Sequence, residues 1–165
     1  MKNIKLLFLG LAVTGMGLSS CKKEAGPAGP AGAAGNANVK SVSFNTQASD
    51  WDGDIVNGYT ANFNAPIITS GIVSTGVVLC YISWFGENYA LPYSYLYNGY
   101  TRHMLFNYEL NNLSVSVRDD DGLTSNPGDF SAVVKIVAIS STGLIANPNL
   151  DLTDYNAVAD AFDLK

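Results

Sequence analysis

Side chains able to do nucleophilic or metal chemistry are few and far apart in this chain. It holds two cysteines and one histidine. Cys80 stands inside an apolar run, where burial keeps a cysteine as an inert thiol. His103 alternates with the apolar Met104, so we expect it on the outward face of its strand. These positions favour neither a Cys–His dyad nor a zinc site, which needs several Cys or His ligands. The sequence also lacks a Gly-x-Ser-x-Gly nucleophile elbow, so we predict no catalysis and no cofactor.

Two Asp-rich turns are the best candidates for binding a cation. The first places Asp50, Asp52 and Asp54 at alternate positions, and the second runs through Asp119–Asp121 with Asp129 later in the same loop. Carboxylates at this spacing can supply some of the six to eight or so oxygens that calcium takes. Neither run contains the Glu that completes an EF-hand loop. Turn formation, for which Asp is well suited, is therefore the favoured interpretation, and a carboxylate pair of the glycosidase type stays open.

Aromatic residues are the most distinctive feature, with ten of them within the 28 positions 81–108. Tyr93, Tyr95 and Tyr97 alternate, so they share one face of a strand. Pro92 precedes them and indicates an edge strand, because proline cannot donate to a sheet ladder. Such a row could stack on sugar rings, or it could pack as tyrosine does on half-buried sheets. We expect Tyr93 and Tyr97 to be partly buried and Tyr95 to be more exposed between them.

The elements that position these residues read mostly as strands. Apolar and polar residues alternate over 113–118, which is typical of a half-buried antiparallel strand. Val77–Trp84 and Phe130–Ile139 are apolar at nearly every position, which predicts strands that are covered on both faces or lie centrally in a sandwich core. Turn signals separate the strands at Asp52-Gly53, Asn57-Gly58, Asn98-Gly99, Asp121-Gly122, Asn126-Pro127-Gly128 and Asn147-Pro148. The pattern predicts an all-β fold, an antiparallel β-sandwich that is jelly-roll-like, over residues 38–165.

A short C-terminal helix is also predicted. Its apolar stripe consists of Tyr155, Val158, Ala159 and Phe162, at positions i, i+3, i+4 and i+7. We expect Asp151 or Thr153 to cap this helix and the helix to close one end of the sandwich. Ile68–Thr75 is consistent with either a short helical turn or a wide loop.

The N-terminus has the three zones of a secretory signal peptide, predicted here to span residues 1–20. Lysines precede the apolar run Leu6–Gly17, which is shorter than the roughly 20 residues of a membrane-spanning helix. Leu18-Ser19-Ser20-Cys21 resembles the lipobox of bacterial lipoproteins. That resemblance implies cleavage before Cys21 and acylation of this cysteine, and several acyl chains anchor a protein stably at a membrane.

Residues 21–37 are predicted to be a linker that follows the lipidated cysteine. Glycine recurs at every third position four times, at 26, 29, 32 and 35, which is the period of collagen. A semi-extended polyproline II spacer is the favoured interpretation. A short triple helix, which would make the protein a trimer, is the alternative.

The lipobox, the Gly-X-Y linker and the β-domain together resemble a group of small collagen-like lipoproteins of Bacteroidetes-type bacteria. Further similar segments are Ser49-Asp50-Trp51, Leu91-Pro92-Tyr93-Ser94-Tyr95 and Asp154-Tyr155-Asn156-Ala157-Val158. The resemblance implies an envelope location and a β fold, and it brings no catalytic residues. Lys23-Glu24 is similar to part of the surface-export signal of such lipoproteins, although a solvated charged linker explains it equally well.

Residues 38–165 carry five basic and thirteen acidic side chains, a net charge of −8. An acidic surface of this kind repels nucleic acid. We therefore expect a non-catalytic domain, lipid-anchored at the outer membrane on the periplasmic face or the cell surface, with a structural or adhesive role. Its partner would be an envelope protein or a glycan. A carbohydrate-binding module that uses the tyrosine strand is the alternative, and an envelope hydrolase comes third.

Overall fold

The computed structural model describes residues 38–127 and 132–164. The predicted signal peptide (1–20), the predicted lipidation site at Cys21 and the Gly-X-Y linker (21–37) lie outside these residues, as does Asp129. All described residues belong to one compact unit, Ala34–Lys165.

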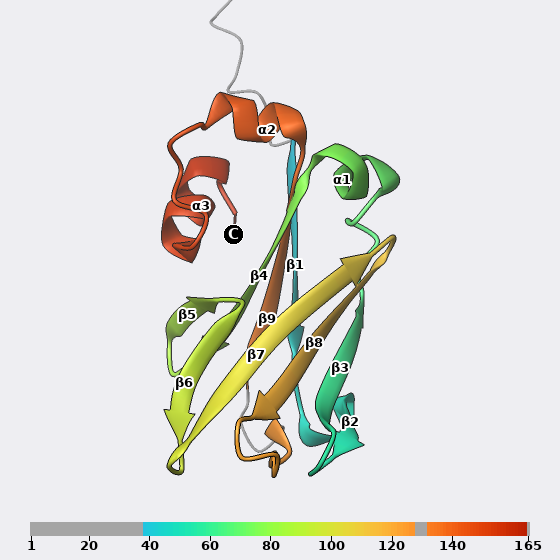
Figure 1. Ribbon diagram of the computed structural model, residues 1–165. Helices are drawn as coiled ribbons and strands as arrows, with labels where there is room; N and C mark the ends of the chain where they lie inside the picture. Colours follow the sequence, from blue (N-terminus) through green and yellow to red (C-terminus); the bar gives the residue numbers. More distant parts are fainter. Residues whose placement is uncertain (1–37, 128–131, 165) are drawn as a thin grey trace, which may run out of the picture. The chain divides into compact units, whose positions relative to one another are not determined.

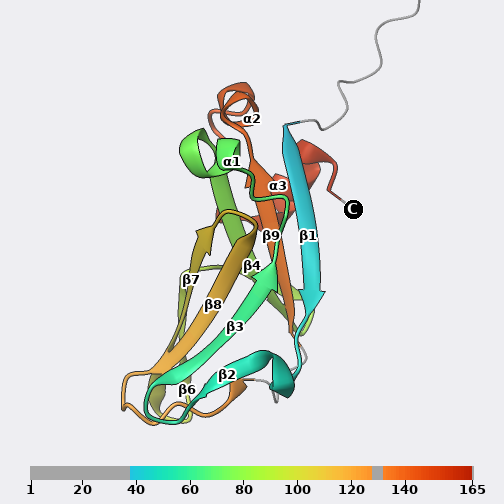
Figure 2. The ribbon, with the colours of Figure 1, turned by 90° about the vertical axis from the view of Figure 1, so that its right-hand side faces the viewer.

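Two antiparallel sheets pack face to face in this unit (Figures 1 and 2). The four-stranded sheet has the order β1 (Val39–Asn45), β9 (Val133–Ile139), β4 (Val77–Trp84) and β5 (Glu87–Ala90). The five-stranded sheet has the order β2 (Trp51–Asp54), β3 (Gly58–Asn64), β8 (Asn112–Asp119), β7 (Tyr100–Glu109) and β6 (Tyr93–Tyr97). The predicted all-β sandwich is confirmed. β1 pairs with β9, and β3 pairs with β8, which lie between them in the sequence; this nested pairing is jelly-roll-like. By contrast, β4–β5 and β6–β7 form local hairpins.

The main core lies between the two sheets. Every second residue of β8 points into it, and Leu113, Val115 and Val117 are at most 1% exposed. Cys80 and Ile82 of β4 meet them from the facing sheet. The period-two pattern predicted for 113–118 is therefore the pattern of a strand with one buried face.

Within the described residues the fold also contains short helices: the 3-10 helix η1 (Ala48–Asp50) and the α-helices α1 (Ser70–Thr75), α2 (Ser141–Ala146) and α3 (Tyr155–Phe162). α1 resolves the open interpretation of Ile68–Thr75 in favour of a helical turn, and α2 was not predicted. Asp154 caps α3 by accepting hydrogen bonds from the backbone N–H groups of Asn156 and Ala157. The prediction of a cap at Asp151 or Thr153 was wrong.

α3 packs on the outer face of the four-stranded sheet, so the expectation that it closes one end of the sandwich was wrong. Val158 and Phe162 are buried in a second cluster with Tyr81, Val137 and Ile139, which point away from the main core. The Tyr81 hydroxyl also donates to the Leu152 carbonyl oxygen at 2.7 Å. Both central strands of this sheet are thus covered on both sides, which explains their apolar runs.

The turn signals that lie within the described residues were correct except at Asp52-Gly53, which lies within β2, and Gly128 of the signal Asn126-Pro127-Gly128 lies outside those residues. Gly53 has a φ of +142°, and a Cβ there would collide with the carbonyl oxygen of Gly58 on β3. Only glycine allows this close strand pairing, so the residue marks a close backbone approach instead of a turn. Asn98-Gly99 is a turn, as predicted, and it closes a two-residue hairpin between β6 and β7 with both residues at positive φ.

Candidate functional site

The predicted tyrosine row lies on β6, which pairs only with β7 and is therefore an edge strand as predicted. Tyr93, Tyr95 and Tyr97 share one face, and all three are half-buried. This face points toward the core, whereas Ser94 and Leu96 point outward. The sequence therefore predicted the strand and its shared face correctly.

The three rings join Trp84 and Tyr89 in what we call the aromatic cluster. The Tyr95 ring centroid lies 5.0 Å from that of Trp84, edge to face, and 5.7 Å from that of Tyr93, stacked. Tyr89 and Tyr93 centroids are 4.7 Å apart. The expectation that Tyr95 is the exposed member was wrong, because its ring packs between its neighbours and against Trp84. Burial also raises the pKa of Tyr95, an effect partly offset by the positive charge of Arg102.

A buried ion pair that the sequence did not predict lies behind the aromatic cluster. Arg102 of β7 is fully buried and faces Asp119 of β8 in direct register. Arg102 Nε donates to Asp119 Oδ1 and Nη2 donates to Oδ2, both at 2.7 Å. Nη2 also donates to Ser125 Oγ at 2.7 Å, and the guanidinium carbon lies 4.1 Å from the centroid of the Tyr97 ring. This bidentate geometry with a ring stacked on it is characteristic of arginine.

The backbone of Asp119 is also held in place. The Thr124 hydroxyl accepts a hydrogen bond from the Asp119 backbone N–H at 2.9 Å, which fixes the start of the loop after β8. Burial by itself lowers the pKa of Arg102, but the hydrogen bonds and charge of Asp119 outweigh burial and keep that pKa above its usual value. Asp119 is thus a structural partner of Arg102, and it is not available as a ligand for a cation.

Two buried donors near the cluster have no hydrogen-bond partner in the described part of the chain. They are Nη1 of Arg102 and Nε1 of Trp51. A cavity of about 10 Å³ lies beside Trp51, and Thr46 and Tyr95 also line it. That volume is near the minimum that holds one water molecule, so the cavity is too small for a sugar or another organic ligand.

Cys80 and His103 lie on different sheets, so the structure does not bring them together. Cys80 is a free cysteine, 1% exposed, and burial raises the pKa of its thiol to about 12. His103 lies on the outer face of β7, as predicted, and its Nδ1 is 2.9 Å from the hydroxyl oxygen of Ser94 on β6. The two side chains sit on an exposed sheet surface. A serine nucleophile needs an oriented base and a site that excludes water, which this position does not offer.

The candidate calcium ligands Asp50, Asp52 and Asp54 are not gathered around one point. Asp50 accepts from the Gln47 backbone N–H at 2.8 Å and caps η1. Asp54 accepts from two backbone N–H groups and the side chain of Asn57, which lowers its pKa. Within residues 38–127 and 132–164, no group of three or more acidic, His or Cys side chains could hold a metal ion. The hydrogen bonds of Asp54 support the turn interpretation at the end of this run, whereas Asp52 lies within β2.

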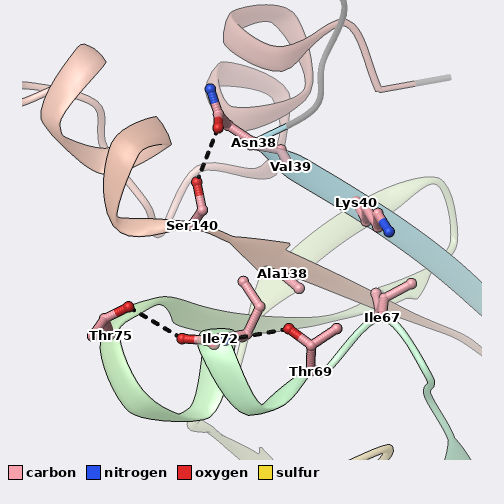
Figure 3. Close-up of a pocket in the computed structure, with 10 residues that line it drawn as sticks. Asn38, Val39, Lys40, Ile67, Thr69, Ile72, Thr75, Ala138 and Ser140 are labelled. Carbon is pink, nitrogen blue, oxygen red and sulfur yellow. Dashed lines mark hydrogen bonds between the residues drawn. The ribbon is translucent and has the colours of Figure 1, made fainter.

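A surface pocket of about 260 Å³ lies at the end of the sandwich where β1 begins (Figure 3). Val39, Ile72 and Ala138 form its apolar part. The hydroxyls around it are already engaged: Thr69 Oγ1 accepts from the Ile72 N–H, and Ser140 Oγ donates to the Asn38 side-chain oxygen at 3.3 Å. The pocket is smaller than most ligand sites, and Lys40 is the one charged side chain among its lining residues.

The outer faces of the two sheets differ. Helices cover much of the four-stranded sheet, whereas the five-stranded sheet has no helix on its outer face within the described residues (Figure 1). Short uncharged polar side chains from β3, β7 and β8 lie side by side there. These residues, which we call the open face, are Thr60, Asn62, Asn107, Ser114 and Ser116.

No protein-family model, curated protein or solved structure matches the chain. Within the described residues, no helix is both long enough and apolar enough to span a membrane.

Proposed function

We propose that the chain is a lipid-anchored protein of the cell envelope, held at the outer membrane through Cys21, whose β-sandwich is a non-catalytic interaction domain. The observation that carries this proposal is the open face. Its hydroxyl and amide groups offer hydrogen-bond donors and acceptors over three neighbouring strands, and nothing in the described part of the chain covers them. A surface of this kind suits adhesion to an envelope protein or a glycan.

The open face is also slightly hollowed. Asn107, Glu109, Asn112 and Ser114 line a shallow depression of about 230 Å³ at one end of it. Leu105, which is 50% exposed and pairs with Ser116, adds one apolar side chain to the open face. An apolar contact surrounded by hydrogen-bonding groups is the usual composition of a protein interface.

The placement of the titratable groups supports a role without catalysis. Asp50, Asp54 and Asp119 each satisfy a local structural partner, and Cys80 is buried as a thiol. Catalytic carboxylates, by contrast, face a shared substrate site at a defined separation.

Carbohydrate binding by the tyrosine strand is the weaker alternative. A sugar stacks on the face of an aromatic ring, and the faces of Tyr89, Tyr93 and Tyr95 are engaged with one another. That packing supports a structural role for these rings.

The anchor is tested by replacing Cys21 with serine. We expect Cys21→Ser to prevent acylation, so that the protein no longer incorporates labelled palmitate and leaves the membrane fraction, because no acyl chain then holds it. Fractionation and metabolic labelling measure this directly. Normal membrane retention of the variant would contradict the proposed anchor.

The open face is tested in the Cys21→Ser background, so that the anchor itself does not cause binding. We expect this soluble protein to co-sediment with purified outer-membrane vesicles or peptidoglycan. Adding Ser116→Arg places a long charged side chain in the middle of the open face and should weaken that binding by about tenfold or more. Ser43→Arg, on an exposed position of β1, is the matched control and should bind like the parent. Equal binding by both variants would exclude the open face as the contact surface.

A further inference from the structure

We infer that one end of the sandwich, formed by α1, α2 and the β7–β8 turn, lies on the lipid surface and contacts it through Val73, Leu110 and Ile145. We call it the proximal end. The inference rests on the proposed lipid anchor at Cys21, and it adds an orientation: the other end of the domain points away from the membrane.

The three segments of the proximal end lie together although they are far apart in the sequence. Asn111 of the β7–β8 turn donates its backbone N–H to Ile68, just before α1, and its carbonyl accepts from Ala65. Ser140, which caps α2, donates its backbone N–H to the carbonyl of Asn38 at 2.8 Å. Figures 1 and 2 both show α1 and α2 at the end of the sandwich where β1 begins.

Each segment exposes one large apolar side chain. Val73 of α1 is 44% exposed, Leu110 of the turn 54%, and Ile145 of α2 78%. The two helices use Ile72 and Gly143 for their buried contacts, so packing of the domain does not account for the exposed residues. Apolar side chains that protrude from a polar surface bind the boundary between lipid headgroups and acyl chains.

The chain enters the domain at this same end. Asn38, the first described residue, lies beside α2, and only the 16 residues 22–37 separate it from the predicted acylated cysteine. A linker of this length spans roughly 50 Å if it is extended as polyproline II. The tether therefore keeps the proximal end at a high effective concentration near the membrane, so that even weak apolar contacts become populated.

The segments that make the proposed contact carry no carboxylate. Among the residues of α1, α2 and the β7–β8 turn Leu110-Asn111 there is no acidic side chain, and Glu109 is the nearest acid on β7. The aspartates that follow α2 in the chain belong to α3, its C-cap and the segment leading into it, outside these three segments. Anionic lipid headgroups repel carboxylates, so segments without them can lie against the lipid.

The experiment uses the full acylated protein in vesicles of phosphatidylethanolamine and phosphatidylglycerol. A nitroxide spin label is attached to one of three exposed positions through Ile145→Cys, Leu123→Cys or Phe85→Cys. Leu123 lies near the opposite end and Phe85 on the β4–β5 turn, and they are 58% and 97% exposed. Acylation of Cys21 and burial of Cys80 leave the introduced cysteine as the reactive one. Accessibility to oxygen and to a water-soluble nickel chelate then measures the depth of each label.

We expect the label on Ile145→Cys to be reached by oxygen and shielded from nickel, and the labels on Leu123→Cys and Phe85→Cys to be fully accessible to nickel. Adding Leu110→Asp should return the first label to water. Protein that floats with the vesicles while all three labels are aqueous would overturn the docking inference and leave the anchor intact. A deeper label at Leu123→Cys or Phe85→Cys would overturn the orientation. Protein that does not float at all would refute the anchor, and with it both proposals.

Discussion

Replacing Asp119 with alanine should lower the free energy of unfolding by about 3–5 kcal/mol, because the change leaves the Arg102 guanidinium buried without a counter-charge. Arg102 is fully buried and donates two 2.7 Å hydrogen bonds to this carboxylate. The guanidinium then keeps its hydrogen bonds to Ser125, which is uncharged, so the penalty is the desolvation of a charge. Chemical denaturation of the wild type and the variant measures the difference.

Two controls separate this effect from the loss of any aspartate. Asp52→Ala, at an exposed position of β2, should change stability by no more than about 0.5 kcal/mol. The double variant Arg102→Met/Asp119→Leu should cost less than Asp119→Ala alone, since removing both charges removes the uncompensated one. If Asp119→Ala were as mild as Asp52→Ala, the ion pair would not stabilise the fold as inferred.

Truncating Tyr95 to alanine should also destabilise the domain, by about 2–3 kcal/mol. Full burial of a large aromatic makes truncation cost about 3–5 kcal/mol, and Tyr95 is half-buried. The lost contacts are those with Trp84 at 5.0 Å and Tyr93 at 5.7 Å between ring centroids. Thermal or chemical denaturation measures the loss.

Leu96→Thr is the matched control for Tyr95→Ala. Leu96 is the next residue on β6, points outward and is 76% exposed, so its replacement by another strand-forming residue should be nearly neutral. A glycan array with the wild type distinguishes the two roles of the strand. Strong glycan binding that Tyr95→Ala abolishes without loss of stability would establish a sugar platform and refute the packing role.

If both variants are destabilised as expected, the aromatic cluster and the ion pair together stabilise the edge strand β6. Tyr97 links them, because its ring lies 6.3 Å from Tyr95 and carries the Arg102 guanidinium on its face. An edge strand has hydrogen bonds on one side only, so its side chains must supply the rest of its stability. On that outcome, the tyrosines of this region serve to hold the edge of the fold together.

Local pattern determined the elements of this fold. Alternation over Leu113–Val117 depends only on the two-residue period of a strand, and the stripe from Tyr155 to Phe162 depends only on the helical period. Pro92 correctly indicated an edge strand, and Asn98-Gly99 correctly indicated the turn that follows it. Both predictions succeed because these residue types restrict or permit the conformation of their own backbone, whatever packs around them. The continuous apolar run of Val77–Trp84 also indicated a strand that is covered on both faces or lies centrally in the core, but it did not indicate which elements cover it.

Long-range packing decided the rest. Sequence reasoning placed Asp119 in an Asp-rich turn and did not single out Arg102, because no local pattern shows that β7 and β8 pair them in register. α3 was expected at one end of the sandwich and lies on the outer face of a sheet. An amphipathic stripe shows that a helix packs against an apolar surface, but it does not show which surface that is. Tyr95 was expected to be exposed, and it is held by Trp84 of the opposite sheet. Periodicity fixes which side of a strand a residue occupies, and only the assembled sheets decide what that side meets.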